Sequence, residues 1–114
     1  MMVMQVLKFI VNAATVVTGL VSLIWPLKVQ EFTGLTANGG RGITEIRTIL
    51  GALFVALGVT AQIYNSPQTY GMLGFMYLAL AFVRGISIIV DKSASSSNII
   101  SVVTELVFGL ILIN

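Results

Sequence analysis

Five ionisable side chains lie within or beside the apolar stretches of this sequence, so any chemistry they perform has to take place in lipid. Arg84 lies inside one apolar run and Glu105 inside the next. Glu45 and Arg47 open an earlier run, and Asp91 closes the run that contains Arg84. A charge at the bilayer centre costs roughly 2.5 to 3.5 kcal/mol on insertion scales, so such side chains face the protein interior and pair. The pattern predicts an ion-pair network or a polar pocket at membrane depth.

The spacing places Arg84 and Glu105 at the same depth. Arg84 precedes Asp91 by seven residues, and Glu105 follows Asn98 by seven. If these residues lie on antiparallel neighbouring helices, each side chain is about 10 Å inside from the same membrane surface. Arginine binds a carboxylate through two parallel N–H bonds, so we predict a direct salt bridge between them, joined by charged residues from the start of the second span. The predicted network contains Glu45, Arg47, Arg84, Asp91 and Glu105.

This network has two interpretations. It can be a structural clamp that fixes how the helices align, or it can line a pocket for a lipid headgroup, a quinone or a proton. The amide and hydroxyl side chains that could line such a pocket are Asn12, Tyr77, Ser87 and Ser101. The glycine-rich stretch at residues 38–42 lacks the strand, lysine and Ser/Thr of a phosphate loop, so we interpret it as a turn.

The composition predicts which kind of secondary structure positions these side chains. The chain has 114 residues, of which 57% are hydrophobic and 9% charged, and its mean hydropathy is +1.03. An ordinary soluble domain has roughly 25% charged residues. Four spans of ~20 residues would use about 80 residues, which leaves no room for a soluble domain. The sequence therefore predicts an all-α fold, an integral membrane four-helix transmembrane bundle that forms one domain over residues 1–114.

Proline and candidate capping residues along the chain indicate where the expected spans begin and end. We expect spans near residues 3–25, 45–65, 70–90 and 98–114, with an interfacial segment and a glycine turn over 26–44. The first span is expected to be retained rather than cleaved as a signal peptide. Pro26 suits the first turn of a new segment, because it lacks an N–H. Thr44 is the expected N-cap of the second span, and Ser97 or Asn98 that of the fourth.

Each expected span carries one stripe of small or polar residues at helical spacing. Helices in lipid associate through small residues and interhelical hydrogen bonds, so these stripes should face the other helices. The glycines expected at helix contacts are Gly19, Gly51, Gly58 and Gly109.

Several function classes are excluded by composition. The absence of cysteine and histidine removes thiolate chemistry, iron–sulfur clusters and histidine-bound metals. We predict no metal site and no cofactor, with a bound lipid or quinone left open. The net charge of +2 is too small and dispersed for nucleic acid. The expected partners are the bilayer and a membrane protein or a second copy. The distribution of Lys and Arg favours external termini in a prokaryotic cytoplasmic membrane.

Three segments, "GITEIRTILGALFVALG", "VRGISIIVD" and "TELVFGLILI", resemble the DUF4345 family of small four-span membrane proteins, within the broader DoxX-like grouping. The resemblance covers nearly the whole chain and implies a four-helix bundle without an established activity. Leu50 and Ala52 flank Gly51, where the family often has a second glycine or an aromatic residue. The features that match the family are Glu45, Arg47, Gly51, Gly58, Arg84, Asp91 and Glu105.

The expected function is that of a noncatalytic membrane protein, either an accessory subunit of a larger complex or a binder of a lipid-like molecule. The DoxX-like resemblance suggests an alternative, a subunit that handles a quinone near Arg47, Arg84 and Glu105, with Tyr77 as a hydrogen-bond donor. Electrons would then come from a partner. A small multidrug exporter is less expected, since those proteins carry a membrane-embedded glutamate in the first span, where this chain has only Asn12.

Overall fold

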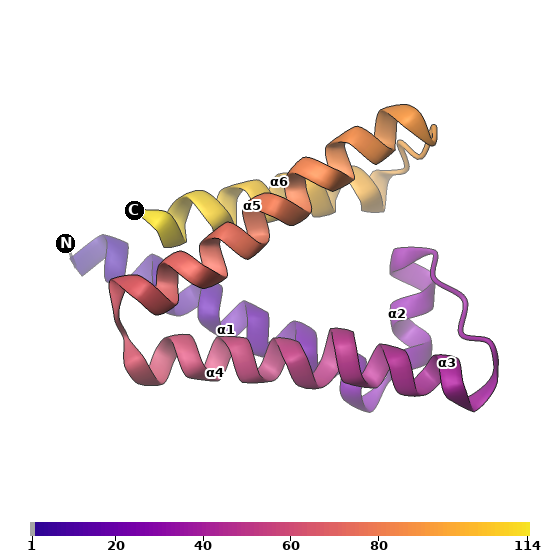
Figure 1. Ribbon diagram of the computed structural model, residues 1–114, viewed down its shortest axis with the longest axis horizontal. Helices are drawn as coiled ribbons and strands as arrows, with labels where there is room; N and C mark the ends of the chain where they lie inside the picture. The colour runs from indigo at the N-terminus through magenta and orange to yellow at the C-terminus, as the bar shows by residue number, and fades with distance from the viewer. Residues whose placement is uncertain (1) are drawn as a thin grey trace. The chain divides into compact units, whose positions relative to one another are not determined.

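The computed structural model describes residues 2–114 as helices joined by short connections, with no strand in that range. The helices are α1 (Met2–Ile24), α2 (Pro26–Thr33), α3 (Gly39–Glu45), the π-helix η1 (Ile46–Ala52), α4 (Leu53–Tyr64), α5 (Pro67–Val90) and α6 (Ser96–Ile113), as labelled in Figure 1. The predicted all-α class is confirmed.

Four helical stretches are long and apolar enough to cross a membrane. They are Met2–Ile24, Gly39–Tyr64, Pro67–Val90 and Ser96–Ile113. Three of them lie within a few residues of the predicted spans, whereas the second begins at Gly39 rather than near residue 45. α3, η1 and α4 form that second span as one continuous helical stretch. These helices indicate a multi-pass membrane protein.

The described chain divides into two compact units, which we treat separately. One is Phe9–Tyr64, and it contains most of α1 together with α2, α3, η1 and α4. The other joins the first residues of the chain, up to Lys8, with Asn65–Asn114, and it contains α5 and α6.

Within Phe9–Tyr64, α1 contacts η1 and α4 through glycines. A Cβ atom added to Gly19 would lie 2.6 Å from the carbonyl oxygen of Gly51, and one added to Gly58 would lie 2.9 Å from the carbonyl oxygen of Asn12. Real Cβ atoms do not come so close, so only glycine permits this backbone approach. The predicted packing roles of Gly19, Gly51 and Gly58 are confirmed.

The start of the second span differs from the prediction. α2 ends at Thr33 and is followed by Gly34, which has a left-handed φ of 78°, and the chain reverses over residues 34–38. Only the first residues of the glycine-rich stretch belong to this turn, because Asn38 precedes α3 and Gly39, with a φ of 70°, opens it. Thr44 is not an N-cap, because it lies inside this longer helix and its hydroxyl donates to the carbonyl oxygen of Gly40 at 3.0 Å.

Local capping sets the ends of α5 and α6. The Ser66 hydroxyl accepts from the backbone N–H of Thr69, and Pro67 follows it as the first residue of α5. The N-cap of α6 is Ser95, whose hydroxyl accepts from the backbone N–H of Asn98 at 3.3 Å. The predicted caps, Ser97 and Asn98, were thus two to three residues too late. With Ser95 in this role, the Asn98 side chain is available for another contact.

α5 and α6 form an antiparallel pair joined by the short loop at one end of the hairpin (Figure 1). A Cβ atom on Gly109 would lie 2.5 Å from Leu78 Cδ2 and 3.0 Å from the carbonyl oxygen of Gly74, so the packing role predicted for Gly109 is confirmed. The sequence analysis did not single out Gly74. Nearby, the ring of Tyr77 meets that of Phe108 edge-on, with centroids 5.4 Å apart.

Candidate functional site: an ion pair between α5 and α6

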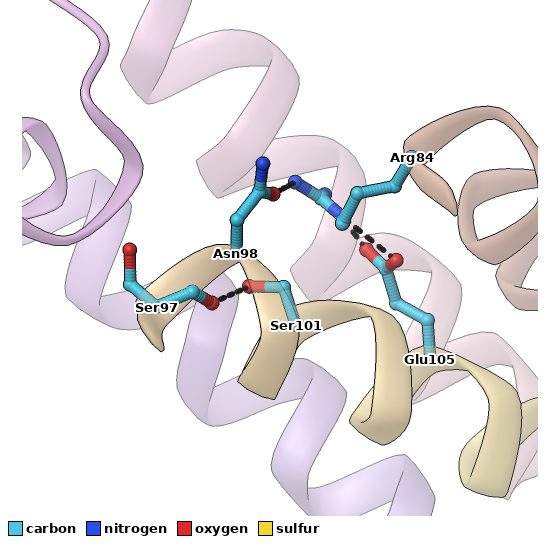
Figure 2. Close-up of polar contacts among 5 residues, drawn as sticks. All are labelled: Arg84, Ser97, Asn98, Ser101 and Glu105. Atoms are coloured by element: carbon cyan, nitrogen blue, oxygen red, sulfur yellow. Dashed lines mark hydrogen bonds and ion pairs between the residues drawn. The ribbon is translucent and has the colours of Figure 1, made fainter. Parts of the chain in front are cut away.

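Arg84 and Glu105 form a two-pronged ion pair between α5 and α6, as predicted from their spacing. Arg84 Nε donates to Glu105 Oε1 at 2.9 Å, and Nη2 donates to Oε2 at 2.8 Å. Figure 2 shows both bonds running in parallel from the guanidinium to the carboxylate. This arrangement uses the planar geometry of arginine, which lysine could not reproduce.

The two partners differ in burial. The Glu105 side chain is 11% exposed, and that of Arg84 is 36% exposed. The carboxylate lies on the buried side of α6, whereas the longer arginine reaches it while part of its surface stays accessible. Because a buried charge is costly unless it is paired and hydrogen-bonded, the carboxylate depends on Arg84 more than Arg84 depends on the carboxylate.

Asn98 is a third member of the cluster, and the predicted network did not include it. Its Oδ1 accepts from Arg84 Nη1 at 3.1 Å (Figure 2). Its Nδ2 donates to the carbonyl oxygen of Ser93 at 2.9 Å, which orients the amide with its oxygen toward the guanidinium. The cluster thereby ties the loop before α6 to the ion pair. The seven-residue separation of Asn98 and Glu105, which puts both on one helix face, was the signal that could have identified it.

Asp91 does not join the pair. It follows the last residue of α5, where it is exposed, and it accepts from the hydroxyl of Ser87 at 2.6 Å. Ser87, four positions earlier on the same helix, thus supplies Asp91 with a local hydrogen-bond donor. Ser101, like Ser87, bonds locally, since its hydroxyl donates to the carbonyl oxygen of Ser97 at 2.9 Å (Figure 2).

Glu45 and Arg47, the two predicted members from the second span, belong to the Phe9–Tyr64 unit. Glu45 pairs with Arg41, one turn earlier on its own helix, at 3.0 Å, and both side chains are largely exposed. Arg47 is exposed and makes no side-chain hydrogen bond or ion pair within the Phe9–Tyr64 unit. The predicted link from these residues to Arg84 and Glu105 therefore stays a prediction.

Asn12 and Tyr77, the remaining candidates for a pocket lining, are both buried. Asn12 Nδ2 donates to Gln62 Oε1 on α4 at 3.0 Å, whereas Asn12 Oδ1 has no hydrogen-bond partner among the described residues. Tyr77 packs against Phe108, as described above. Within residues 2–114, no group of three or more His, Cys, Asp or Glu side chains could hold a metal ion.

The sequence matches the family model of DUF4345, described as a domain of unknown function, over residues 3–114. The chain belongs to the DUF4345 family. Comparison with curated proteins and with solved structures finds no match. Since the DUF4345 description carries no activity, any function for this member has to be argued from its own residues.

Proposed function

We propose that this DUF4345 member is a noncatalytic integral membrane protein that acts as an accessory subunit of a larger membrane complex, with the Arg84–Glu105 pair as a structural clamp. The observation that supports the proposal is that the charged groups of the cluster are hydrogen-bonded to other members of the same cluster. Both carboxylate oxygens accept a bond from the guanidinium, and the third guanidinium nitrogen donates to Asn98.

A clamp and a reactive site make different demands on these groups. A proton carrier or a ligand site needs a donor or acceptor that can change partners during function. Here a ligand would have to displace one charge from the other, and breaking a buried pair costs roughly 3 to 5 kcal/mol. The same geometry holds α5 and α6 in one alignment, because sliding either helix by one residue would separate the charges by about 1.5 Å along the helix axis.

The accessory role is supported by the apolar surface of the hairpin. Phe75, Phe82 and Ile89 on α5 are between 64% and 79% exposed. In a bilayer such side chains contact lipid or another transmembrane helix. The four apolar helices of the described residues can associate with other membrane proteins through such surfaces. The proposal therefore includes a membrane protein partner or a second copy, in a prokaryotic cytoplasmic membrane with external termini.

The alternatives are less well supported. A quinone-handling subunit of a DoxX-like oxidoreductase would have to bind its quinone through the two guanidinium N–H groups that the three bonds of Arg84 leave unused. A small multidrug exporter would need a carboxylate embedded in the first span, where this chain has the amide of Asn12 instead. A binder of a lipid-like molecule would use a different part of the molecule, within the Phe9–Tyr64 unit.

A charge-swapped variant tests the clamp. Arg84→Glu combined with Glu105→Arg keeps opposite charges at the same depth but exchanges their positions. We expect the swapped protein to accumulate in the membrane and, after gentle extraction, to copurify with the same stoichiometric partner as the native protein in native mass spectrometry. The single change Glu105→Arg places two cations together and should abolish accumulation.

Two outcomes would contradict the proposal. If the native protein carries no stoichiometric protein partner and no second copy in several mild extraction conditions, the accessory role is wrong. If the swapped protein is stable and keeps its partner, yet the cells behave like cells without the protein, then the chemical identity of each charge matters and the pair is a reactive site.

A further inference from the structure

An open cavity of about 360 Å³ lies where the end of α1 turns into α2 and faces the second span. All of it belongs to the Phe9–Tyr64 unit. Its walls are apolar apart from three charged side chains. The lining residues are Ile24, Trp25, Pro26, Leu27, Lys28, Glu31, Ile43 and Arg47.

The three charged residues of this cavity lack protein partners. Lys28, Glu31 and Arg47 are exposed, and within their own unit, Phe9–Tyr64, none of them makes a side-chain hydrogen bond or an ion pair. This contrasts with Glu45, Arg84 and Glu105, each of which is paired. Two cations and one anion on the wall of one cavity present a charge pattern that no side chain of the Phe9–Tyr64 unit satisfies.

The cavity lies near the edge of the hydrocarbon region. Trp25 directly follows the apolar α1, and tryptophan is enriched at the level of lipid headgroups. The second span, at 26 residues, is about 39 Å long by the ~1.5 Å helical rise, about 9 Å more than the ~30 Å hydrocarbon core. If this excess lies at the end beside Trp25, about six residues, 39–44, reach the headgroup layer, and Arg47 follows them within one helical turn, close enough for its long side chain to extend to that layer.

The π-helix presents Arg47 on this wall. η1 runs over Ile46–Ala52, and short π-helical segments occur frequently at functional sites because the wider turn redirects side chains. On either side of Arg47, η1 is anchored, since Ile46 is 5% exposed and a Cβ atom on Gly51 would lie 3.1 Å from the backbone nitrogen of Leu23. A firmly packed segment thus carries an exposed, unpaired arginine.

We propose that this cavity binds the headgroup of a phospholipid that carries both a phosphate and a primary ammonium group, as phosphatidylethanolamine does. The phosphate lies between Lys28 and Arg47, because arginine and lysine are the side chains that bind phosphate best. The ammonium donates to the Glu31 carboxylate. The apolar wall formed by Trp25 and Leu27 packs against the glycerol and the first methylene groups.

Glu31 is the residue that selects this class of lipid. A phospholipid with a neutral glycerol head has no positive charge to pair with the Glu31 carboxylate. The negative charge of its phosphate would then lie near Glu31 without a compensating ion pair. A choline head carries a positive charge but no N–H to donate. Only a primary ammonium supplies both the charge and the hydrogen bonds. This proposal does not depend on the accessory role, because the cavity belongs to the other unit from the ion pair.

Native mass spectrometry of the full chain with lipids of identical acyl chains tests the site. We expect phosphatidylethanolamine to bind more tightly than phosphatidylglycerol or phosphatidylcholine. Lys28→Gln and Arg47→Gln should each weaken that binding about tenfold, the usual scale for losing a charge-assisted hydrogen bond. Glu31→Gln should remove the preference over phosphatidylglycerol while leaving phosphate-dependent binding. Lys92→Gln, which changes an exposed cation of the other unit, is the matched control and should have no effect.

Other results would overturn the proposal. Equal binding of phosphatidylglycerol and phosphatidylethanolamine to the native protein would remove the role of Glu31. Equal losses in Arg47→Gln and Lys92→Gln would mean that binding follows net charge rather than this cavity. Displacement of the lipid by inorganic phosphate at millimolar concentration would show that the cavity takes a free anion. Thermal melting of each variant separates a loss of binding from a loss of folding.

Discussion

The contact between α1 and α4 and the contact between α5 and α6 use glycine in different ways. In the first, a Cβ atom on Gly19 would meet backbone atoms, the carbonyl oxygen of Gly51 at 2.6 Å and the nitrogen of Val55 at 2.7 Å. In the second, a Cβ atom on Gly109 would first meet the end of a flexible side chain, Leu78 Cδ2, at 2.5 Å. Backbone atoms cannot move aside, whereas a leucine can change its rotamer.

The two helix pairs also differ in their polar contacts, which are charged between α5 and α6 and neutral between α1 and α4. α5 and α6 are joined by three bonds from one guanidinium. α1 and α4 are joined by a neutral amide pair, Asn12 with Gln62, in which the buried Oδ1 of Asn12 has no hydrogen-bond partner among the described residues. The comparison indicates that shape fixes the alignment of α1 with α4, and that charge fixes the alignment of α5 with α6. Changes at the two contacts should therefore have different consequences.

The largest effect is expected from separating the two charges. Arg84→Leu leaves a carboxylate that is 11% exposed without its partner, and we expect a loss of about 3 to 5 kcal/mol in the free energy of unfolding in detergent. Glu105→Leu should cost less, because Arg84 is partly accessible and can extend toward the membrane surface. The double variant should be more stable than Arg84→Leu alone. Thermal or denaturant unfolding of the three variants in detergent measures these differences.

The exposed pair Arg41–Glu45 is the control for this experiment. Its side chains are 84% and 51% exposed, so Arg41→Leu should change the stability by less than about 1 kcal/mol. Glu105→Gln should be milder than Glu105→Leu, because an amide oxygen still accepts from the guanidinium. Strictly additive losses in the double variant would mean that Arg84 and Glu105 act independently, and charge would then not set this helix contact.

The next largest effect is expected from substituting the glycines at the two helix contacts. Gly19→Ala should destabilise by about 2 to 3 kcal/mol, because the methyl group meets rigid backbone, while Gly109→Ala should cost about 1 kcal/mol, because Leu78 can yield. Gly85→Ala serves as the control, since a Cβ atom there has no neighbour within 4 Å; it should be neutral or slightly stabilising. Melting temperatures in one detergent give the order. Equal losses at positions 19 and 109 would remove the proposed difference between the two contacts.

The smallest effect is expected at the amide pair. Gln62→Leu removes the bond partner of the buried Asn12, and we expect a loss of about 1 kcal/mol, close to the scale of interhelical hydrogen bonds in membranes. Asn12→Leu together with Gln62→Leu should recover part of that loss, because no buried amide is left unbonded. A double-mutant cycle by thermal unfolding measures the coupling. A coupling as large as that of Arg84 with Glu105 would mean that polar bonding dominates at both contacts.

The sequence determined the class of this protein and the positions of its spans. Long apolar runs in water are unstable, and in lipid they must satisfy their backbone groups as helices, so hydropathy alone sets the number and approximate extent of the four spans. The depth of Arg84 and Glu105 follows from counting residues to the chain reversals, because an α-helix rises by a constant amount. The four predicted packing glycines followed from the rule that small residues permit close helix approach, which depends on composition and spacing.

Tertiary structure decided which groups satisfy one another. Asn98 rather than Asp91 completes the arginine cluster, since the loop turns the amide toward α5 and the aspartate finds a serine on its own helix. Glu45 pairs with Arg41 because α3 begins earlier than the glycine-rich sequence suggests, which brings these residues one helical turn apart. The cavity with Lys28, Glu31 and Arg47 exists because α2 folds back toward a π-helical segment. These outcomes depend on the path of the connections and on competition among nearby partners, and neither can be obtained from the pattern of a single helix.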